Sequence, residues 1–250
     1  MNKPVRIYIS ANRGLPNLSR SLSTLMDRVE RSGIPKSNLV IVDSLPSEFE
    51  YPALQRLWLD SHVDDFHGLY LHCKSSSKTD AVEIENGLAW LNYMADGVLD
   101  NHQICRIHLE RGADLVGCMW YRHFKGNFFW FRSSYVKTLE DPQSISFGER
   151  FNAEYWCSQA LWRDTKVLKP RVKNLGYLPI SSDADFSSLH RNGVKLDLEK
   201  FHICCDIKDL DAPNNGCLYD RFVLSRKDYE NHGELIFRSS NYNSDFFLRT

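Results

Sequence analysis

The spacing of apolar and polar positions near the start of the chain predicts a strand, a helix and a second strand. Residues 5–10 (VRIYIS) form a β-branched and aromatic run that is typical of a buried strand. Residues 18–33 carry their apolar side chains on one helical face and end at Gly33, a common helix stop. Residues 38–44 (NLVIVDS) return to a continuous apolar run. Strands that are apolar on both faces favour a parallel sheet covered by helices.

The same reading extends to the middle of the chain. Residues 66–74 and 113–121 are strand-like, and residues 84–112 between them are helical, with a break near Gly97. Residues 133–142 indicate a helical turn that stops near the proline at its end.

Later elements are fewer. Residues 144–162 indicate a helix that is capped near Asn152, and residues 172–179 a late strand. Beyond position 180 the periodicity weakens. We therefore predict an α/β fold: one domain over residues 1–180 with a central, mostly parallel sheet flanked by helices. An irregular C-terminal extension over residues 181–250 would complete that domain or the acceptor site.

Composition narrows the class of protein. Of 250 residues, 42% are hydrophobic and 25% charged, and the net charge of −1 argues against a strongly basic nucleic-acid surface, though not against a local basic groove. No run reaches the roughly 18 apolar residues of a membrane span, and the N-terminus lacks the apolar core of a signal peptide. Seven scattered cysteines without a Cys-x-x-Cys pair indicate free, mostly buried thiols in a reducing cytoplasm.

Polar residues follow the first two strands, where ligands of open α/β sheets bind. Ser10, Asn12 and Arg13 end the first strand, and Asp43 ends the second. A carboxylate there can accept a hydrogen bond from a base N–H or a ribose hydroxyl, so we predict a nucleoside site; a turn or cap role is the alternative for Asp43. The dinucleotide and phosphate-loop glycine motifs are absent, which disfavours a dehydrogenase or an ATPase.

The third strand ends in a basic and hydroxyl-rich stretch, residues 71–78 (LHCKSSSK). His72 and Lys74 alternate with apolar residues, so we expect both to point to one face, with Lys78 nearby. Basic side chains at a strand end suit a diphosphate, because they are costly there unless they are used. A solvated polar loop is the alternative.

Residues 123–132 (HFKGNFFWFR) mix polar and aromatic side chains after the fourth strand. Gly126 permits close backbone approach, and Asn127 offers both a donor and an acceptor. We expect His123 and Asn127 to contact a ligand. A core strand with a polar lead-in is the alternative.

The aromatic residues of this segment divide between two roles. Trp130 could help to form a wall on which a sugar ring or a base stacks. For Phe129 and Phe131 we favour a role in the core.

Acidic residues supply further candidates. Glu154 lies near a helix start among aromatic residues, where partial burial would raise the pKa of a carboxylate and make it a better general base. Its alternative is a surface glutamate. Asp114 is either a ligand or a cap at the start of a strand. Asp183 and Asp185 form an Asp-x-Asp pair that could hold Mg²⁺ or Mn²⁺, although so short a motif is weak evidence.

The order and spacing of five motifs resemble a group of small, mostly bacterial and viral glycosyltransferases with a GT-A-like, nucleotide-sugar-binding fold. The match covers roughly residues 66–160. The motifs are LYLHCKSSSK (69–78), WLNYM (90–94), DLVGCMW (114–120), HFKGNFFWFRSSY (123–135) and RFNAEYW (150–156). The opening strand–helix–strand is also similar to the nucleotide-binding start of such enzymes.

This resemblance implies transfer of a sugar from a nucleotide-diphosphate sugar, with a UDP-sugar as the expected donor, to a hydroxyl. Glu154 stands where many inverting members keep a general base. The metal motif that many members carry midway along the chain is replaced by His72 and Lys74, so either basic residues neutralise the diphosphate or Mg²⁺ or Mn²⁺ is held elsewhere. The sugar- and acceptor-binding residues expected on this basis are Asp114, His123, Gly126, Asn127, Trp130 and Trp156.

Two acceptors remain open. One is a growing surface saccharide, as in polysaccharide biosynthesis; the other is a hydroxymethylated base of bacteriophage DNA, which would place the enzyme in the host cytoplasm. The tail mixes basic and aromatic residues, which suits nucleic acid, but acidic residues are nearly as frequent there. A non-catalytic carbohydrate- or nucleotide-binding module is the alternative from another class.

Overall fold

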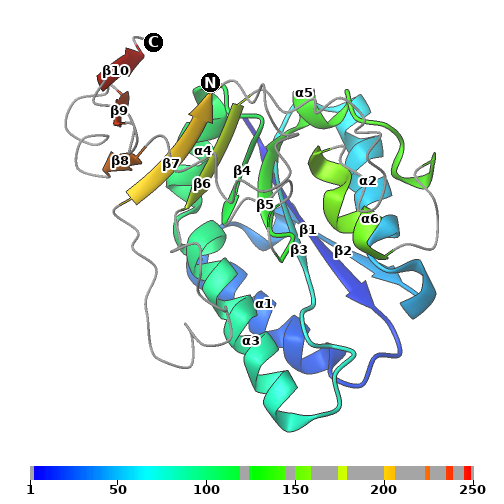
Figure 1. The fold of residues 1–250 in the computed structure, drawn as a ribbon. Coiled ribbons are helices and arrows are strands. Elements are labelled where there is room, and N and C mark those ends of the chain that lie inside the picture. The colour runs from blue at the N-terminus through cyan, green and yellow to red at the C-terminus, as the bar shows by residue number, and fades with distance from the viewer. Residues whose placement is uncertain are drawn as a thin grey trace.

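An open sheet with helices on both faces makes up the computed structural model of the chain (Figure 1). The structure describes residues 3–118, 124, 126–144, 150–158, 174–178, 200–205, 223–225, 235–238 and 245–248. The helical elements are α1 (Leu18–Ser32), η1 (Lys36–Asn38), η2 (Pro46–Glu48), α2 (Tyr51–Val63), α3 (Ala81–Ala95), η3 (Asp96–Asp100), α4 (His102–Glu110), α5 (Ser133–Val136), η4 (Pro142–Ser144), α6 (Arg150–Tyr155) and η5 (Trp156–Ser158). The strands are β1 (Val5–Asn12), β2 (Leu39–Ser44), β3 (His67–His72), β4 (Leu115–Cys118), β5 (Phe129–Arg132), β6 (Asn174–Leu178), β7 (Lys200–Cys205), β8 (Val223–Ser225), β9 (Leu235–Arg238) and β10 (Asp245–Leu248).

The α/β class and the flanking helices are confirmed, but the sheet is mixed rather than mostly parallel. Its strand order is β10-β9-β8-β7-β6-β4-β5-β3-β1-β2. Strand β1 runs parallel to β2 and β3, and β4 runs parallel to β6, whereas β5 lies antiparallel between β3 and β4. Residues 119–128, which join β4 to β5, are too few for the crossover of about a dozen residues or more that parallel neighbours need.

Alternation along the strands builds one core on each face of the sheet. Ile7 and Ile9 of β1 pack with α1, α3 and α4, whereas Tyr8 between them packs with α2, α5 and α6. Figure 1 shows these two sets of helices on opposite sides of the strands. Phe129 and Phe131 are fully buried in the α2-side core, as predicted.

Local signals explain the end of α1 and the break between α3 and α4. Helix α1 ends at Gly33, whose φ of 75° is left-handed. The break predicted near Gly97 is a π-helical segment, η3, between α3 and α4. Helix α2 was not predicted, because the exposed apolar residues Leu59 and Val63 blur the stripe of its buried face.

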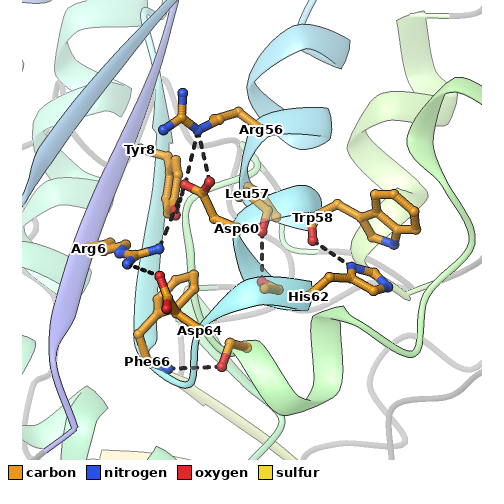
Figure 2. Close-up of polar contacts among 11 residues, drawn as sticks. Arg6, Tyr8, Arg56, Leu57, Trp58, Asp60, His62, Asp64 and Phe66 are labelled. Carbon is orange, nitrogen blue, oxygen red and sulfur yellow. Dashed lines mark hydrogen bonds and ion pairs between the residues drawn. The ribbon is translucent and has the colours of Figure 1, made fainter.

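Helix α2 is tied to β1 by polar contacts as well as by its core face (Figure 2). Tyr8 donates to Asp60 over 2.8 Å, and Arg56 holds the same carboxylate from one turn away, at 3.0 Å. Arg6 of β1 pairs with Asp64 just after the helix. These contacts fix the C-terminal end of α2, and its N-terminus points to the opposite edge of the sheet.

Two further predictions concern the chain as a whole. Cys73, Cys105 and Cys157 are buried free thiols, which confirms the prediction for these three residues. Burial raises the pKa of the Cys73 and Cys157 thiols to about 12, so neither is a reactive thiolate. Among the described residues, no helix combines the length and apolarity needed to cross a membrane.

Candidate functional site

A pocket of about 220 Å³ opens at the carboxyl ends of β1 and β3, where an open α/β sheet places its ligands. It receives residues from both strand ends, from the segment before α2 and from the loop after β3. Its lining residues are Ser10, Asn12, Leu15, Pro46, Phe49, Glu50, His72, Cys73, Lys74, Ser75, Ser76 and Ser77.

Four predicted site residues meet in this pocket: Ser10, Asn12, His72 and Lys74. The parallel register explains why, since Ser10 of β1 lies opposite His72 of β3. The side chain of Asn12 is oriented by Ser44, whose hydroxyl donates to its amide oxygen.

The remaining residues of the predicted nucleotide site lie outside the pocket lining. Arg13 and Asp43 form an exposed ion pair beyond β1 and β2, and the Arg13 guanidinium lowers the pKa of the Asp43 carboxyl. Lys78 is exposed and pairs with Glu83 over 3.2 Å.

The loop after β3 is held firmly against α3. Ser75 has a φ of 59°, and a Cβ at Gly87 would come within 1.3 Å of its hydroxyl oxygen. The Lys74 ammonium lies 5.2 Å from the centre of the Trp90 ring. His72 faces the α2 side and Lys74 faces α3, so they do not point to one face as expected, because strand alternation ends at His72.

Glu50, at the N-cap position of α2, has three polar side-chain contacts in the pocket. Its side chain is 8% exposed. Its Oε2 accepts hydrogen bonds from the Tyr70 hydroxyl over 2.8 Å and from the Asn127 amide over 2.5 Å. Its Oε1 lies 3.0 Å from Nδ1 of His72. One carboxylate therefore joins α2, β3 and the turn before β5.

The contacts of His72 fix where its protons lie. Nε2 lies 2.9 Å from the carbonyl oxygen of Gly126, which can only accept, so Nε2 carries a proton. Nδ1 faces a carboxylate oxygen of Glu50, so a second proton lies between these two atoms. With both ring nitrogens engaged, His72 has no N–H left for a phosphate in this arrangement.

The Gly126–Asn127 turn lies behind the pocket, where it contacts the lining residues His72 and Glu50. Both residues have left-handed backbone, with φ of 87° and 58°. A Cβ on Gly126 would come within 2.1 Å of the Met94 sulfur, so a glycine is required there. Asn127 is fully buried, and its side-chain oxygen has no hydrogen-bond partner among the described residues.

Glu154 is not among the residues that line the pocket. It is partly buried on α6 between residues of the α2-side core. Its charge reaches the Tyr70 hydroxyl. The pKa of Tyr70 is raised well above its usual value, first by burial, then by Glu50, with Glu154 adding to the effect. Two carboxylates thus act on one buried phenol.

Three predicted sugar or acceptor residues lie away from the pocket. Trp130 is fully buried on the α3 side of the sheet and donates to the Val98 carbonyl over 2.7 Å. Trp156 is buried in the other core and donates to the Glu140 carbonyl. Asp114 pairs with Arg132 at the start of β4, which is the opposite edge of the sheet.

Some predicted residues cannot be placed. His123, Asp183 and Asp185 lie outside the described residues. Within the described part of the chain, no group of three or more His, Cys, Asp or Glu side chains has the geometry of a metal site.

Together, the fold and the pocket define an α/β protein with a polar pocket at the carboxyl ends of strands β1 and β3. No protein-family model, curated protein or solved structure matches the chain.

Glu50 is the main site residue that the sequence did not reveal. It sits in a stretch without a recognisable motif, and its role depends on contacts with β3 and with the turn before β5. The one signal that pointed to it is indirect: His72 and Asn127 are polar residues next to apolar strands, and such residues need a partner.

Proposed function

We propose that this protein is a nucleotide-sugar-dependent glycosyltransferase. The observation that carries the proposal is the pocket at the carboxyl ends of β1 and β3, which joins Ser10 and Asn12 to Lys74 and the hydroxyl-rich loop. A nucleoside diphosphate needs neutral donors and acceptors for its base and ribose, and a cation with hydroxyls for its phosphates. The five sequence motifs that resemble such enzymes support the same activity.

In this proposal the nucleotide sugar binds with its diphosphate near Lys74. Ser10 and Asn12 contact the nucleoside, and the exposed pair of Arg13 and Asp43 flanks it. Lys74 is fixed by its stacking on Trp90, so its charge is in place before the reaction. Because His72 is already committed to Glu50 and Gly126, the diphosphate contact is assigned to Lys74 alone.

Sugar transfer then needs one general base. Glu154 takes the proton of the acceptor hydroxyl as the oxygen forms a bond to the anomeric carbon of the sugar. The bond from that carbon to the diphosphate oxygen breaks, and its electron pair leaves with the diphosphate, which Lys74 stabilises. Attack from the face opposite the leaving group inverts the anomeric configuration. No step is assigned to a metal ion.

A thermal-unfolding screen of the wild-type protein against UDP-, GDP-, ADP- and TDP-sugars, each with and without Mn²⁺, tests the proposal. A donor present at about 100 times its Kd should stabilise the fold by about 2.7 kcal/mol, which raises Tm by several degrees. The donor found is then incubated with the protein, and release of the nucleoside diphosphate is followed.

The outcomes separate the candidate classes. Release of the diphosphate supports a transferase, since such enzymes slowly pass the sugar to water. Binding without release on prolonged incubation points to the non-catalytic binding module. Absence of any stabilisation by the whole panel rejects the proposal. Addition of an oligosaccharide or of DNA containing hydroxymethylated bases then distinguishes the two acceptor classes by which one becomes glycosylated.

A further inference from the structure

Glu50 determines which groups around the pocket donate hydrogen bonds and which accept them; we call this arrangement the hydrogen-bond polarity of the pocket. A carboxylate can only accept, so the Tyr70 hydroxyl and the Asn127 amide must both point their hydrogens at Oε2. Three donors are better held by a carboxylate than by a neutral acid, which places the proton shared with His72 on Nδ1. The donors of β3 and of the turn before β5 therefore point at Glu50.

Through Tyr70, Glu50 also determines how the Ser10 hydroxyl in the pocket wall is oriented. The phenol gives its hydrogen to Glu50, so its oxygen is left to accept. Ser10 lies diagonally next to Tyr70 in the β1–β3 register and on the same face of the sheet, which makes its hydroxyl the neighbouring donor for the phenol oxygen. Ser10 lines the pocket and, having donated inward, offers only lone pairs to a ligand. The wall formed by Ser10 and Glu50 thus presents acceptors.

The rim across the pocket has the opposite character. Lys74 carries a positive charge and can only donate. A phosphate, which can only accept hydrogen bonds, can bind to Lys74 but has no donor to bind at the Ser10–Glu50 wall. Hydroxyl and N–H groups fit that wall instead.

We propose that Glu50 is a positioning residue that orients the ligand, with hydroxyl or N–H groups of the sugar or nucleoside against the Ser10–Glu50 wall and the phosphates against Lys74. This inference rests on the proposed function and adds the direction in which the nucleotide sugar lies. Glu50 acts by fixing the orientation of Tyr70, and through it of Ser10, rather than by taking part in bond making.

The test compares two probes in calorimetric titrations of the full chain. The probes are inorganic pyrophosphate and UDP-glucose, or the GDP-, ADP- or TDP-sugar that replaces it in the screen. Glu50→Gln keeps the shape of the side chain but can donate, so it should weaken the nucleotide sugar at least about tenfold. Its affinity for pyrophosphate should stay within about twofold, since separate contacts act nearly additively. Lys74→Met should weaken both probes.

Matched controls make the result specific. Glu85→Gln changes an exposed glutamate on α3 and should alter neither affinity. Equal loss of both probes in Glu50→Gln, with a native thermal transition, would mean a general structural role and overturns the inference alone. An unchanged affinity for the nucleotide sugar overturns it too. If the wild-type protein binds no nucleotide sugar, the proposed function falls, and this inference with it.

A spectroscopic measurement on the wild-type protein covers the case in which Glu50→Gln does not fold. Nitrogen NMR of labelled histidine should show both ring nitrogens of His72 protonated at neutral pH. A ring with an unprotonated Nδ1 would place the proton on Glu50, make its Oε1 a donor, and overturn the fixed polarity.

Discussion

A carboxylate with several hydrogen-bond partners lies at each end of helix α2, and only one of the two faces a pocket. Tyr8 and Tyr70 are direct neighbours in the β1–β3 register, and each donates its hydroxyl to a carboxylate over 2.8 Å. The partner of Tyr8 is Asp60, which Arg56 also holds (Figure 2). The partner of Tyr70 is Glu50, which faces a pocket.

The difference shows how one structural device can serve either stability or recognition. Asp60 is neutralised by arginines at a partly open surface, where such pairs tether elements at modest gain. Glu50 is more deeply buried and takes its hydrogen bonds from a phenol, an amide and an imidazole. Removing one partner of such a buried carboxylate is costly, and the carboxylate makes each of its neighbours point a hydrogen at it.

The largest effect expected at the pocket end concerns Glu154. In Glu154→Gln the acceptor hydroxyl keeps a hydrogen-bond partner but loses its base, so kcat should fall by at least about 100-fold. The Kd for the nucleotide sugar should remain close to the wild-type value. Steady-state kinetics with titration of the donor measure both quantities.

A control for Glu154 comes from the other side of the sheet. Glu110→Gln changes an exposed residue at the end of α4 and should leave turnover unchanged. Full activity of Glu154→Gln would remove this residue from the mechanism and move the search for a base to other carboxylates near Tyr70.

Gly126 allows a test of the turn behind the pocket. Gly126→Ala should lower the free energy of unfolding by about 2–4 kcal/mol, because it adds left-handed strain and a clash with Met94. Gly14→Ala has a similar φ of 82° with nothing within 4 Å, so only the strain applies and the loss should be smaller. Denaturant unfolding of both variants measures the difference, and equal losses would mean that the Met94 contact relaxes freely.

The sequence was informative wherever a signal is local. Strand periodicity placed Ser10, Asn12, His72 and Lys74 at one edge of the sheet, and Gly97 marked the break between α3 and α4. Both follow from residues close together in the chain, so no tertiary contact was needed to predict them.

Long-range contacts account for what the sequence left undecided. Glu50 matters because it accepts a hydrogen bond from Asn127, 77 positions away, and nothing in the sequence around Glu50 predicts that contact. Trp130 was placed at the ligand because aromatic residues beside polar ones suit sugars, yet strand alternation turns its ring to the α3 side. Which face of the sheet holds the pocket could not be read from that segment alone.

The edge of the sheet opposite the pocket should control acid stability. His67 is buried there, and burial lowers its pKa to about 4, with Lys3 and then Arg106 contributing. In the unfolded chain its pKa is about 6.5. Between these values the unfolded state binds more protons, so the stabilisation is complete above about pH 6.5 and is lost as the pH falls toward 4.

The expected size of this effect is about 3 kcal/mol. Between pH 7.5 and 4, the unfolding free energy of the wild type should fall by about that much more than the unfolding free energy of His67→Gln. Parallel curves for the two proteins would show that His67 titrates alike in the folded and unfolded states.

The smallest difference is expected between the two tyrosines, and it is the most direct test of the contrast between the ends of α2. Tyr70→Phe leaves a buried carboxylate short of one donor, which should cost about 1–3 kcal/mol. Tyr8→Phe leaves Asp60 with its arginines, so about 0.5–1.5 kcal/mol is expected. Only Tyr70→Phe should also weaken the nucleotide sugar, because it releases the Ser10 hydroxyl to rotate. If Tyr8→Phe weakened binding of the nucleotide sugar as much as Tyr70→Phe does, the networks at the two ends of α2 would be energetically coupled through the helix.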